Sequence, residues 1–181
     1  MSNSFDLTAP TEGDVVDLIL DDHRRFEELL RQLRDTSSDR DAVRQTFSTL
    51  HVAHAEAEEK HVYPTLRKKN AITAHEAEHG EEEHAEGNAA LLDVLEADDV
   101  RSEEFDELVE KLATAVNHHM TEEELTILNP AREEVNDSVR GKLGEAFARE
   151  RDAQISADCG NVENVRKIVA RAEKEGLLDE G

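Results

Sequence analysis

The sequence predicts an all-α protein: an antiparallel, up-down-up-down four-helix bundle with a C-terminal helical extension. Proline and glycine, which break helices, number only 3 and 8 in a chain of 181 residues. Apolar residues recur at spacings of three and four, which is typical of helices, and do not alternate as in strands. Aromatic residues make up only 3% of the chain and β-branched runs are missing, so we expect no strands. Short connections between long helices favour antiparallel neighbours.

The bundle is expected to occupy residues 12–135. Its four amphipathic helices are expected at about residues 12–34, 38–69, 73–96 and 102–135. Thr11 is the expected N-terminal cap of the first helix. The polar segments "DTSSDRD" and "ADDVRSEE" interrupt the periodicity after the first and third helices.

Residues 136–181 form the predicted extension. Its first helix is marked by apolar residues at every fourth position: Val139, Leu143 and Phe147. Asn161 is the expected cap of a last helix, which should end near Gly176. We expect the extension to pack on the bundle or on a second copy of the chain, as in a homodimer. Nothing in it indicates chemistry.

The charge of the chain excludes two classes of partner. Lys and Arg number 21 and Asp and Glu 44, a net charge of −23 that is spread along every segment. Such a surface repels nucleic acid and anionic lipid. It is typical of a halophilic protein in a salt-rich cytoplasm, where salt screens the self-repulsion.

The chain has one cysteine, Cys159, so neither a disulfide framework nor a thiolate zinc site is expected. The N-terminal segment "MSNSFDLTAP" does not resemble a secretory signal. No apolar stretch approaches the length of a membrane span. We therefore expect a cytoplasmic protein.

Helical phase places one histidine of each predicted bundle helix on the core face. In the first helix His23 shares a face with Ile19 and Phe26. In the second helix one stripe runs through Val43, Phe47, Leu50, His54, Glu58 and His61. The fourth helix continues from Val116 to His119 and Glu123, and tracing back from Leu91 in the third helix reaches His84. The inward polar set is therefore His23, His54, Glu58, His84, His119 and Glu123.

This set predicts a metal site. A buried carboxylate costs several kcal/mol unless a cation compensates it, and the stripes offer no inward Lys or Arg. A lone inward histidine such as His23 is more often a hydrogen-bonded core residue. Four such histidines with two glutamates, each one turn after a histidine, are better explained as metal ligands. His75 is expected in water, whereas the roles of the other four histidines stay open: His51, His61, His79 and His118.

Two segments of the sequence echo each other: "HAEAEEKHVYP" at 54–64 and "HMTEEELTILNP" at 119–130. Both contain His-x-x-x-Glu-Glu, an apolar pair and a proline. Together with "LDDH" ending at His23 and "EEEH" ending at His84, they resemble the hemerythrin-like family of HHE cation-binding domains. The resemblance covers about residues 12–135.

The resemblance implies a four-helix bundle that holds two iron ions, bridged by carboxylates and an oxo or hydroxo group. His54 and His119 would each bind one iron, Glu58 and Glu123 would bridge, and His23 and His84 would complete the ligand set. Zinc or manganese is also compatible with these ligand types. The implied function is binding of O2 or NO, or sensing of iron or redox state, without enzymatic activity.

The sequence departs from the oxygen-carrying members in the third helix. Those proteins have two metal-side histidines four residues apart, whereas Gly80 stands four residues before His84. Either the third helix is rotated relative to this phase, or one iron lacks a histidine and water, His51, His79 or His118 fills the gap. The departure favours sensing of iron, NO or redox state over reversible O2 carriage.

Two other functions compete with this interpretation. A ferritin-like ferroxidase or peroxidase needs Glu-x-x-His on two helices. The pairs Glu58/His61, Glu76/His79 and Glu81/His84 match locally, but the fourth helix has none. A metal-free helical interaction module would leave the inward glutamates uncompensated.

Overall fold

The computed structural model describes residues 6–178. The first half of "MSNSFDLTAP", the segment that does not resemble a secretory signal, lies outside the described residues. The regular structure of this part of the chain is entirely helical, which confirms the all-α prediction. The bundle region contains α1 (Val15–Arg34), α2 (Arg40–Ala57), α3 (Tyr63–Lys68), α4 (Ala74–Glu96), α5 (Glu103–Glu123) and α6 (Asn129–Glu134). The extension contains α7 (Asp137–Ser156) and α8 (Val162–Glu175).

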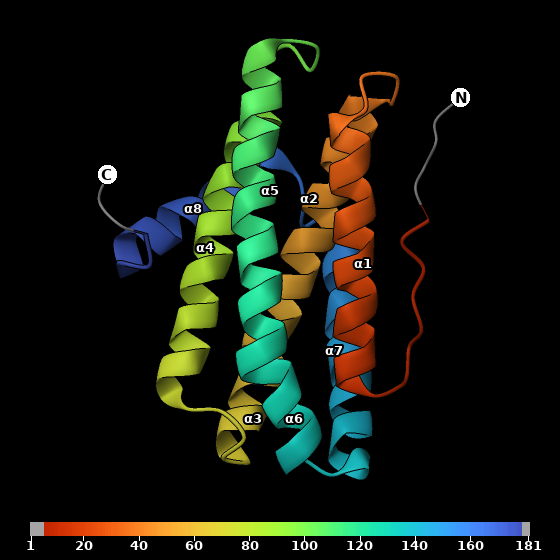
Figure 1. Cartoon of the computed structure of the whole chain (residues 1–181), viewed down its shortest axis with the longest axis vertical. Helices are drawn as coiled ribbons and strands as arrows, with labels where there is room; N and C mark the ends of the chain where they lie inside the picture. The colour runs from red at the N-terminus through yellow and green to blue at the C-terminus, as the bar shows by residue number, and fades with distance from the viewer. Residues whose placement is uncertain (1–5, 179–181) are drawn as a thin grey trace.

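The long helices α1, α2, α4 and α5 contact one another in a closed ring. α1 packs on α2 and α5, and α4 packs on the same two helices. Figure 1 shows the α1–α2 and α4–α5 connections at one end of the molecule and the short helices α3 and α6 together at the other. Along residues 6–178 no helix is long and apolar enough to cross a membrane.

Side chains at the helix ends explain where the helices start and stop. The cap of α1 is Asp14, whose carboxylate accepts from the Val16 amide, so the prediction of Thr11 was wrong by three residues. Thr73 begins α4 with a reciprocal capping box with Glu76. The predicted cap of α8 is confirmed, since Asn161 accepts from the Asn164 amide. Gly176 ends that helix in the left-handed region.

Two π-helical turns interrupt the predicted continuous helices 38–69 and 102–135. The turn η1 spans Glu58–Val62 and joins α2 to α3, and η2 spans Glu124–Leu128 and joins α5 to α6. Each turn starts at or directly after the glutamate of a His-x-x-x-Glu segment. Turns of this kind contain one extra residue and are frequent at functional sites.

The extra residue changes which side chains point inward. One residue rotates the following chain by about 100° relative to an α-helix. His61, which the uninterrupted phase placed on the core stripe, is therefore partly exposed, while Val62 and Tyr63 are buried. The prolines Pro64 and Pro130 lie in the first turn of α3 and α6, where a missing N–H is tolerated.

Two apolar clusters fill the bundle and leave a polar layer between them. One cluster includes Phe26 and Leu50, and the other includes Ile19 and Ala57. His23 lies between Ile19 and Phe26 along α1, and the polar residues of α2 lie between Leu50 and Ala57 in the same way. The polar side chains are thus held deep in the molecule by apolar packing above and below.

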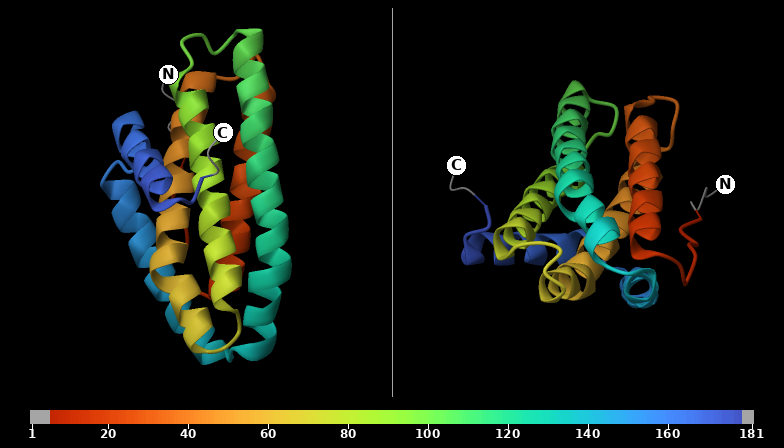
Figure 2. Two further views of the ribbon diagram at one scale, coloured as in Figure 1. Left: turned by 90° about the vertical axis from the view of Figure 1, so that its left-hand side faces the viewer. Right: turned by 60° about the horizontal axis from the view of Figure 1, so that its bottom comes forward.

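The extension packs on the bundle. α7 packs against both α1 and α2, and α8 packs against α4 (Figure 2). A Cβ at Gly144 of α7 would overlap the carbonyl oxygen of Gly13, so the close approach of α7 to the start of α1 requires glycine there. Phe147 is buried, and its ring forms a T-shaped pair with the His54 ring at 5.6 Å between ring centroids.

Candidate metal centre

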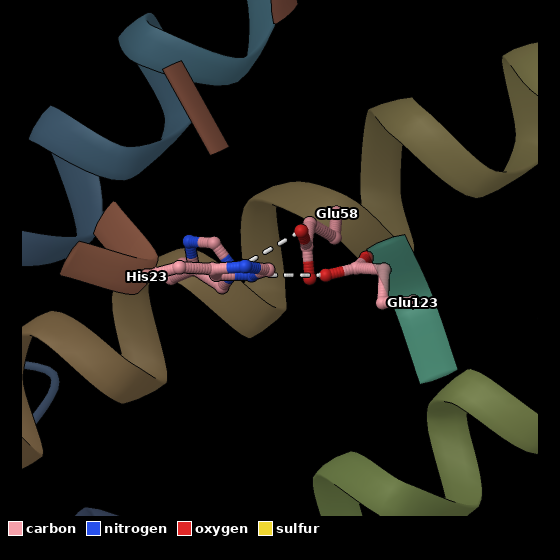
Figure 3. A group of neighbouring side chains, drawn as sticks. His23, Glu58 and Glu123 are labelled. Atoms are coloured by element: carbon pink, nitrogen blue, oxygen red, sulfur yellow. Dashed lines mark hydrogen bonds and ion pairs between the residues drawn. The ribbon is translucent and has the colours of Figure 1, made fainter. Parts of the chain in front are cut away.

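The six residues predicted from helical phase meet in the polar layer. They form two groups, and within each group one potential ligand atom per residue lies within 4.8 Å of all the others. One group is His23, His54, Glu58 and Glu123, and the other is Glu58, His84 and His119. Figure 3 shows the carboxylates of Glu58 and Glu123 directed toward the same space as the His23 imidazole. Glu58 is common to both groups and therefore links them.

Each glutamate faces two imidazoles through their Nε2 atoms. The two oxygens of Glu58 lie 3.0 Å from His54 Nε2 and 3.0 Å from His84 Nε2. Glu123 Oε2 lies 3.1 Å from His23 Nε2 and 3.6 Å from His119 Nε2. Each glutamate thus joins the histidine one turn earlier on its own helix to a histidine from another helix.

Several of these buried atoms have no hydrogen bond. Among the described residues, both oxygens of Glu58 and the Nε2 atoms of His54, His84 and His119 lack a partner of suitable geometry. The side chain of Glu58 is 0% exposed. Unsatisfied buried polar atoms are rare and costly, so a cluster of them needs a physical cause. Nitrogen and carboxylate donors aimed at one enclosed space fit a metal ion.

The other ring nitrogen of each histidine donates to a carboxylate. His54 Nδ1 donates to Asp22 at 3.0 Å, and His84 Nδ1 donates to Glu59 at 2.8 Å. His119 Nδ1 donates to Glu83 at 3.0 Å, and His23 Nδ1 donates to Glu124 at 2.9 Å. A proton held on Nδ1 leaves the lone pair of Nε2 free for a metal, an arrangement that is common around metal-binding histidines.

These four carboxylates follow one rule around the bundle. The bundle consists of four helical rods: α1, α2 with η1 and α3, α4, and α5 with η2 and α6. Each carboxylate comes from the rod that precedes its histidine in the chain, and the carboxylate of the fourth rod accepts from the histidine of the first. The order is α1 to α2, η1 to α4, α4 to α5, and η2 to α1. The orientation of every ring therefore depends on the packing of two neighbouring rods.

Sequence reasoning missed these four residues because helical phase places them off the inward stripes. A signal was nevertheless present, since each of them is the sequence neighbour of an inward residue. The neighbouring pairs are Asp22–His23, Glu58–Glu59, Glu83–His84 and Glu123–Glu124. Residues at such borders of the stripe lie between two rods and can reach the next helix.

Arg151 of α7 extends the network beyond the bundle. Its guanidinium donates to both oxygens of Asp22, at 2.8 and 2.9 Å, and the arginine is only 2% exposed. Asp22 in turn accepts from His54. The expectation that the extension carries no chemistry therefore missed a buried positive charge that is two side chains away from the candidate ligand atoms.

The charges in the layer shift its pKa values. Burial alone would lower the pKa of His54, but Glu58 and Asp22 raise it to about 10. Burial likewise opposes the rise in the pKa of His84, which Glu58 and Glu59 hold well above its usual value. Burial would raise the pKa of Glu58, but His54 and His84 keep it well below its usual range. The layer can therefore hold protons or a metal ion, and the two compete.

Tyr63 occupies the space beside Gly80, the residue four positions before His84. The phenol donates to Glu123 Oε1 at 3.0 Å, and the ring stacks on His84 at 5.8 Å between centroids. The pKa of Tyr63 lies well above its usual value, mainly because the phenol is buried and also because Glu123 and Glu58 are negatively charged. The protonated phenol is thus a fixed donor to one of the two central carboxylates.

The histidines whose roles the sequence left open lie outside both groups. His51 is buried and its Nδ1 donates to Asn88 at 3.1 Å, while burial and nearby imidazoles lower its pKa to about 3. It is a neutral core residue. His79 and His118 lie on the surface beside Glu83. His75 is exposed, as predicted.

The fold and the site together define a helical protein with a buried histidine and carboxylate cluster of the kind that binds metal cations. The model of the hemerythrin HHE cation-binding domain matches residues 14–130. This match covers more than half of the chain, and the protein belongs to that family. No curated protein and no solved structure matches the chain.

Proposed function

We propose that the polar layer holds two iron ions and that the protein binds O2 or NO, or senses iron or redox state, without being an enzyme. His54 and His119 are the proposed terminal ligands of the two ions, Glu58 and Glu123 the bridging ligands, and His23 and His84 complete the set. When bound, the iron pair would supply an open coordination position and a redox couple. The proposal includes the up-down-up-down topology of residues 12–135, with 136–181 as the extension.

The observation that carries the proposal is the position of Glu58. Its two oxygens face histidines of different helices at 3.0 Å and have no hydrogen bond among the described residues. A carboxylate with this geometry is suited to link two cations. The four carboxylates that accept from Nδ1 support it further, because they hold all four rings with Nε2 directed inward.

Sensing is favoured over reversible O2 carriage by the third helix. Tyr63 fills the space beside Gly80, so this position offers the centre a hydrogen-bond donor instead of an imidazole. The proposed partners are a small diatomic molecule and a second copy of the chain. The proposal includes neither nucleic acid nor membrane among the partners.

The alternative functions find less support. A ferritin-like site needs inward Glu-x-x-His histidines on two helices, but of the three candidates only His84 is buried, while His61 is partly exposed and His79 is on the surface. For a metal-free interaction module the side chain of Glu58 would be a cost, since it is 0% exposed and its two oxygens have no hydrogen bond among the described residues.

The test is metal analysis with matched variants. Protein expressed with ample iron should contain close to two irons per chain. His54→Ala and Glu58→Ala should each lower the iron content sharply and remove any visible absorption that arises from an oxo-bridged iron pair. Glu56→Ala and Lys60→Ala, whose side chains lie off the layer, should change neither. One zinc per chain and no iron in the wild type would refute the proposal.

A further inference from the structure

A third group of potential ligands lies on the surface between α4 and α5. It consists of His79 and Glu83, one turn apart on α4, and His118 of α5. Glu83 Oε1 lies 3.4 Å from His79 Nε2 and 3.3 Å from His118 Nε2. The two imidazoles are about half exposed, whereas the carboxylate between them is only 5% exposed. The group therefore has a buried acceptor covered by two imidazoles that solvent can reach.

The two oxygens of Glu83 have different environments. Oε2 accepts from His119 Nδ1 at 3.0 Å, inside the layer described above. Oε1 has no hydrogen bond within residues 6–178, although it is buried and directed at the two exposed rings. A buried carboxylate oxygen without a donor is expensive, and the imidazoles at 3.3 and 3.4 Å do not have the geometry to satisfy it. A cation between the three side chains would.

We propose that His79, Glu83 and His118 bind a third metal ion, a divalent transition cation such as Zn²⁺, separate from the pair in the layer. Two imidazoles and one carboxylate are the ligand types that Zn²⁺ and similar ions prefer, while Ca²⁺ and Mg²⁺ prefer oxygen alone. Three protein ligands with a water molecule in the fourth position form a site that is open to solvent. The ion exchanges with the surrounding solution and not with the core.

The surroundings suit a cation. Glu82 Oε2 lies 3.6 Å from His79 Nδ1, and the chain as a whole carries a charge of −23. Glu83 joins this surface site to His119 through its second oxygen. An ion at Oε1 draws electron density away from Oε2 and so weakens the hydrogen bond that orients His119. Occupancy of the surface site therefore changes how firmly His119 is oriented in the layer.

The experiment uses Zn²⁺ and iron-loaded protein. Isothermal titration should find one Zn²⁺ bound per chain, with the iron content unchanged before and after. X-ray absorption at the zinc edge should show nitrogen and oxygen ligands at about 2.0–2.2 Å and no sulfur. Release of iron on adding Zn²⁺ would place the zinc in the layer and overturn the proposal, as would the lack of stoichiometric binding.

Surface variants identify the ligands. His118→Ala and His79→Ala should each weaken Zn²⁺ binding by at least about tenfold, since one of three protein ligands is lost. His75→Ala is the matched control, because His75 lies one turn before His79 on α4 and is exposed. If His75→Ala weakens binding and His118→Ala does not, a pair of histidines along α4 binds the ion and the proposed site is wrong. This outcome does not depend on which metal the layer holds.

Discussion

The hydroxyl of Tyr63 lies 2.9 Å from the point where a Cβ at Gly80 would stand. The ring cannot move away easily, because Tyr63 is 1% exposed and stacks on His84. The glycine in α4 and the tyrosine that follows η1 therefore depend on each other. This relationship explains why a residue with poor helix propensity is found inside a long helix.

Gly80→Ala should destabilise the protein by about 1–2 kcal/mol, because overpacking of about 1–3 kcal/mol exceeds the gain in helix propensity of up to about 1 kcal/mol. Urea unfolding followed by circular dichroism measures it. Gly141→Ala is the matched control, since nothing lies within 4 Å of a Cβ at that position in α7. The control should be neutral or slightly stabilising. Equal stabilisation of both variants would show that Tyr63 does not press on Gly80.

Tyr63→Phe should lower the free energy of unfolding of chelated protein, from which a chelator has removed the metal, by about 1–3 kcal/mol. This is the usual cost of leaving a buried acceptor without its donor. The ring and its packing on His84 are kept, so the change isolates the hydrogen bond to Glu123. Urea unfolding of chelated wild type and variant is the measurement. An unchanged midpoint would mean that Glu123 has another donor in solution.

Glu59→Gln should weaken iron binding by about 10–100-fold, the range typical of losing the partner that orients a ligating histidine. Glu59 accepts from His84 Nδ1 and lies at the edge of the layer, so the fold should survive. Competition with a chelator gives the affinity. Glu56→Gln, three residues earlier and bonded to no ring, should leave the affinity unchanged. Equal loss in both variants would point to a general effect of surface charge.

The stability of chelated protein should be highest between about pH 4.5 and 6.5. The raised pKa of His54 contributes stability that is complete below its ordinary value of 6.5 and lost as the pH rises through about 10. The lowered pKa of Glu58 contributes stability above its ordinary value of 4.5, which is lost as the pH falls.

Iron-loaded protein should behave in the opposite way on the alkaline side, because iron needs neutral imidazoles and so binds more tightly as the pH rises. The difference in melting temperature between loaded and chelated protein should therefore widen from pH 6 to pH 9. Thermal melts at constant ionic strength measure it. A chelated protein whose melting temperature climbs steadily over this range would contradict the assignment of charged pairs to the layer.

Much of this architecture could be predicted from the sequence, because helix formation and burial follow the period of the apolar residues. The same phase distinguished the buried His84 from the exposed His75, whereas the role of His79 was left open; that His84 binds metal stays a prediction. The π-helical turns could not be predicted, since a fixed rotation per residue conceals an inserted one. This is why His61 was placed on the wrong face.

The carboxylates behind the rings could not be predicted for another reason. Asp22 and Glu83 belong to one helix and serve the histidine of the next, so their role exists only once two rods are packed together. Arg151 is a still clearer case, because 129 residues separate it from Asp22. Helical phase describes one helix at a time and contains no information about these pairs.

The pairing of Arg151 with Asp22 has a consequence for the modularity of the chain. The family match ends at residue 130, and α7 begins after it, yet α7 supplies the cation that neutralises Asp22 and the phenyl ring that covers His54. A fragment cut after residue 135 would keep every proposed ligand but lose Arg151 and Phe147, and Asp22 would keep only His54 as its partner. The two segments are separate in the sequence but share one buried hydrogen-bond network.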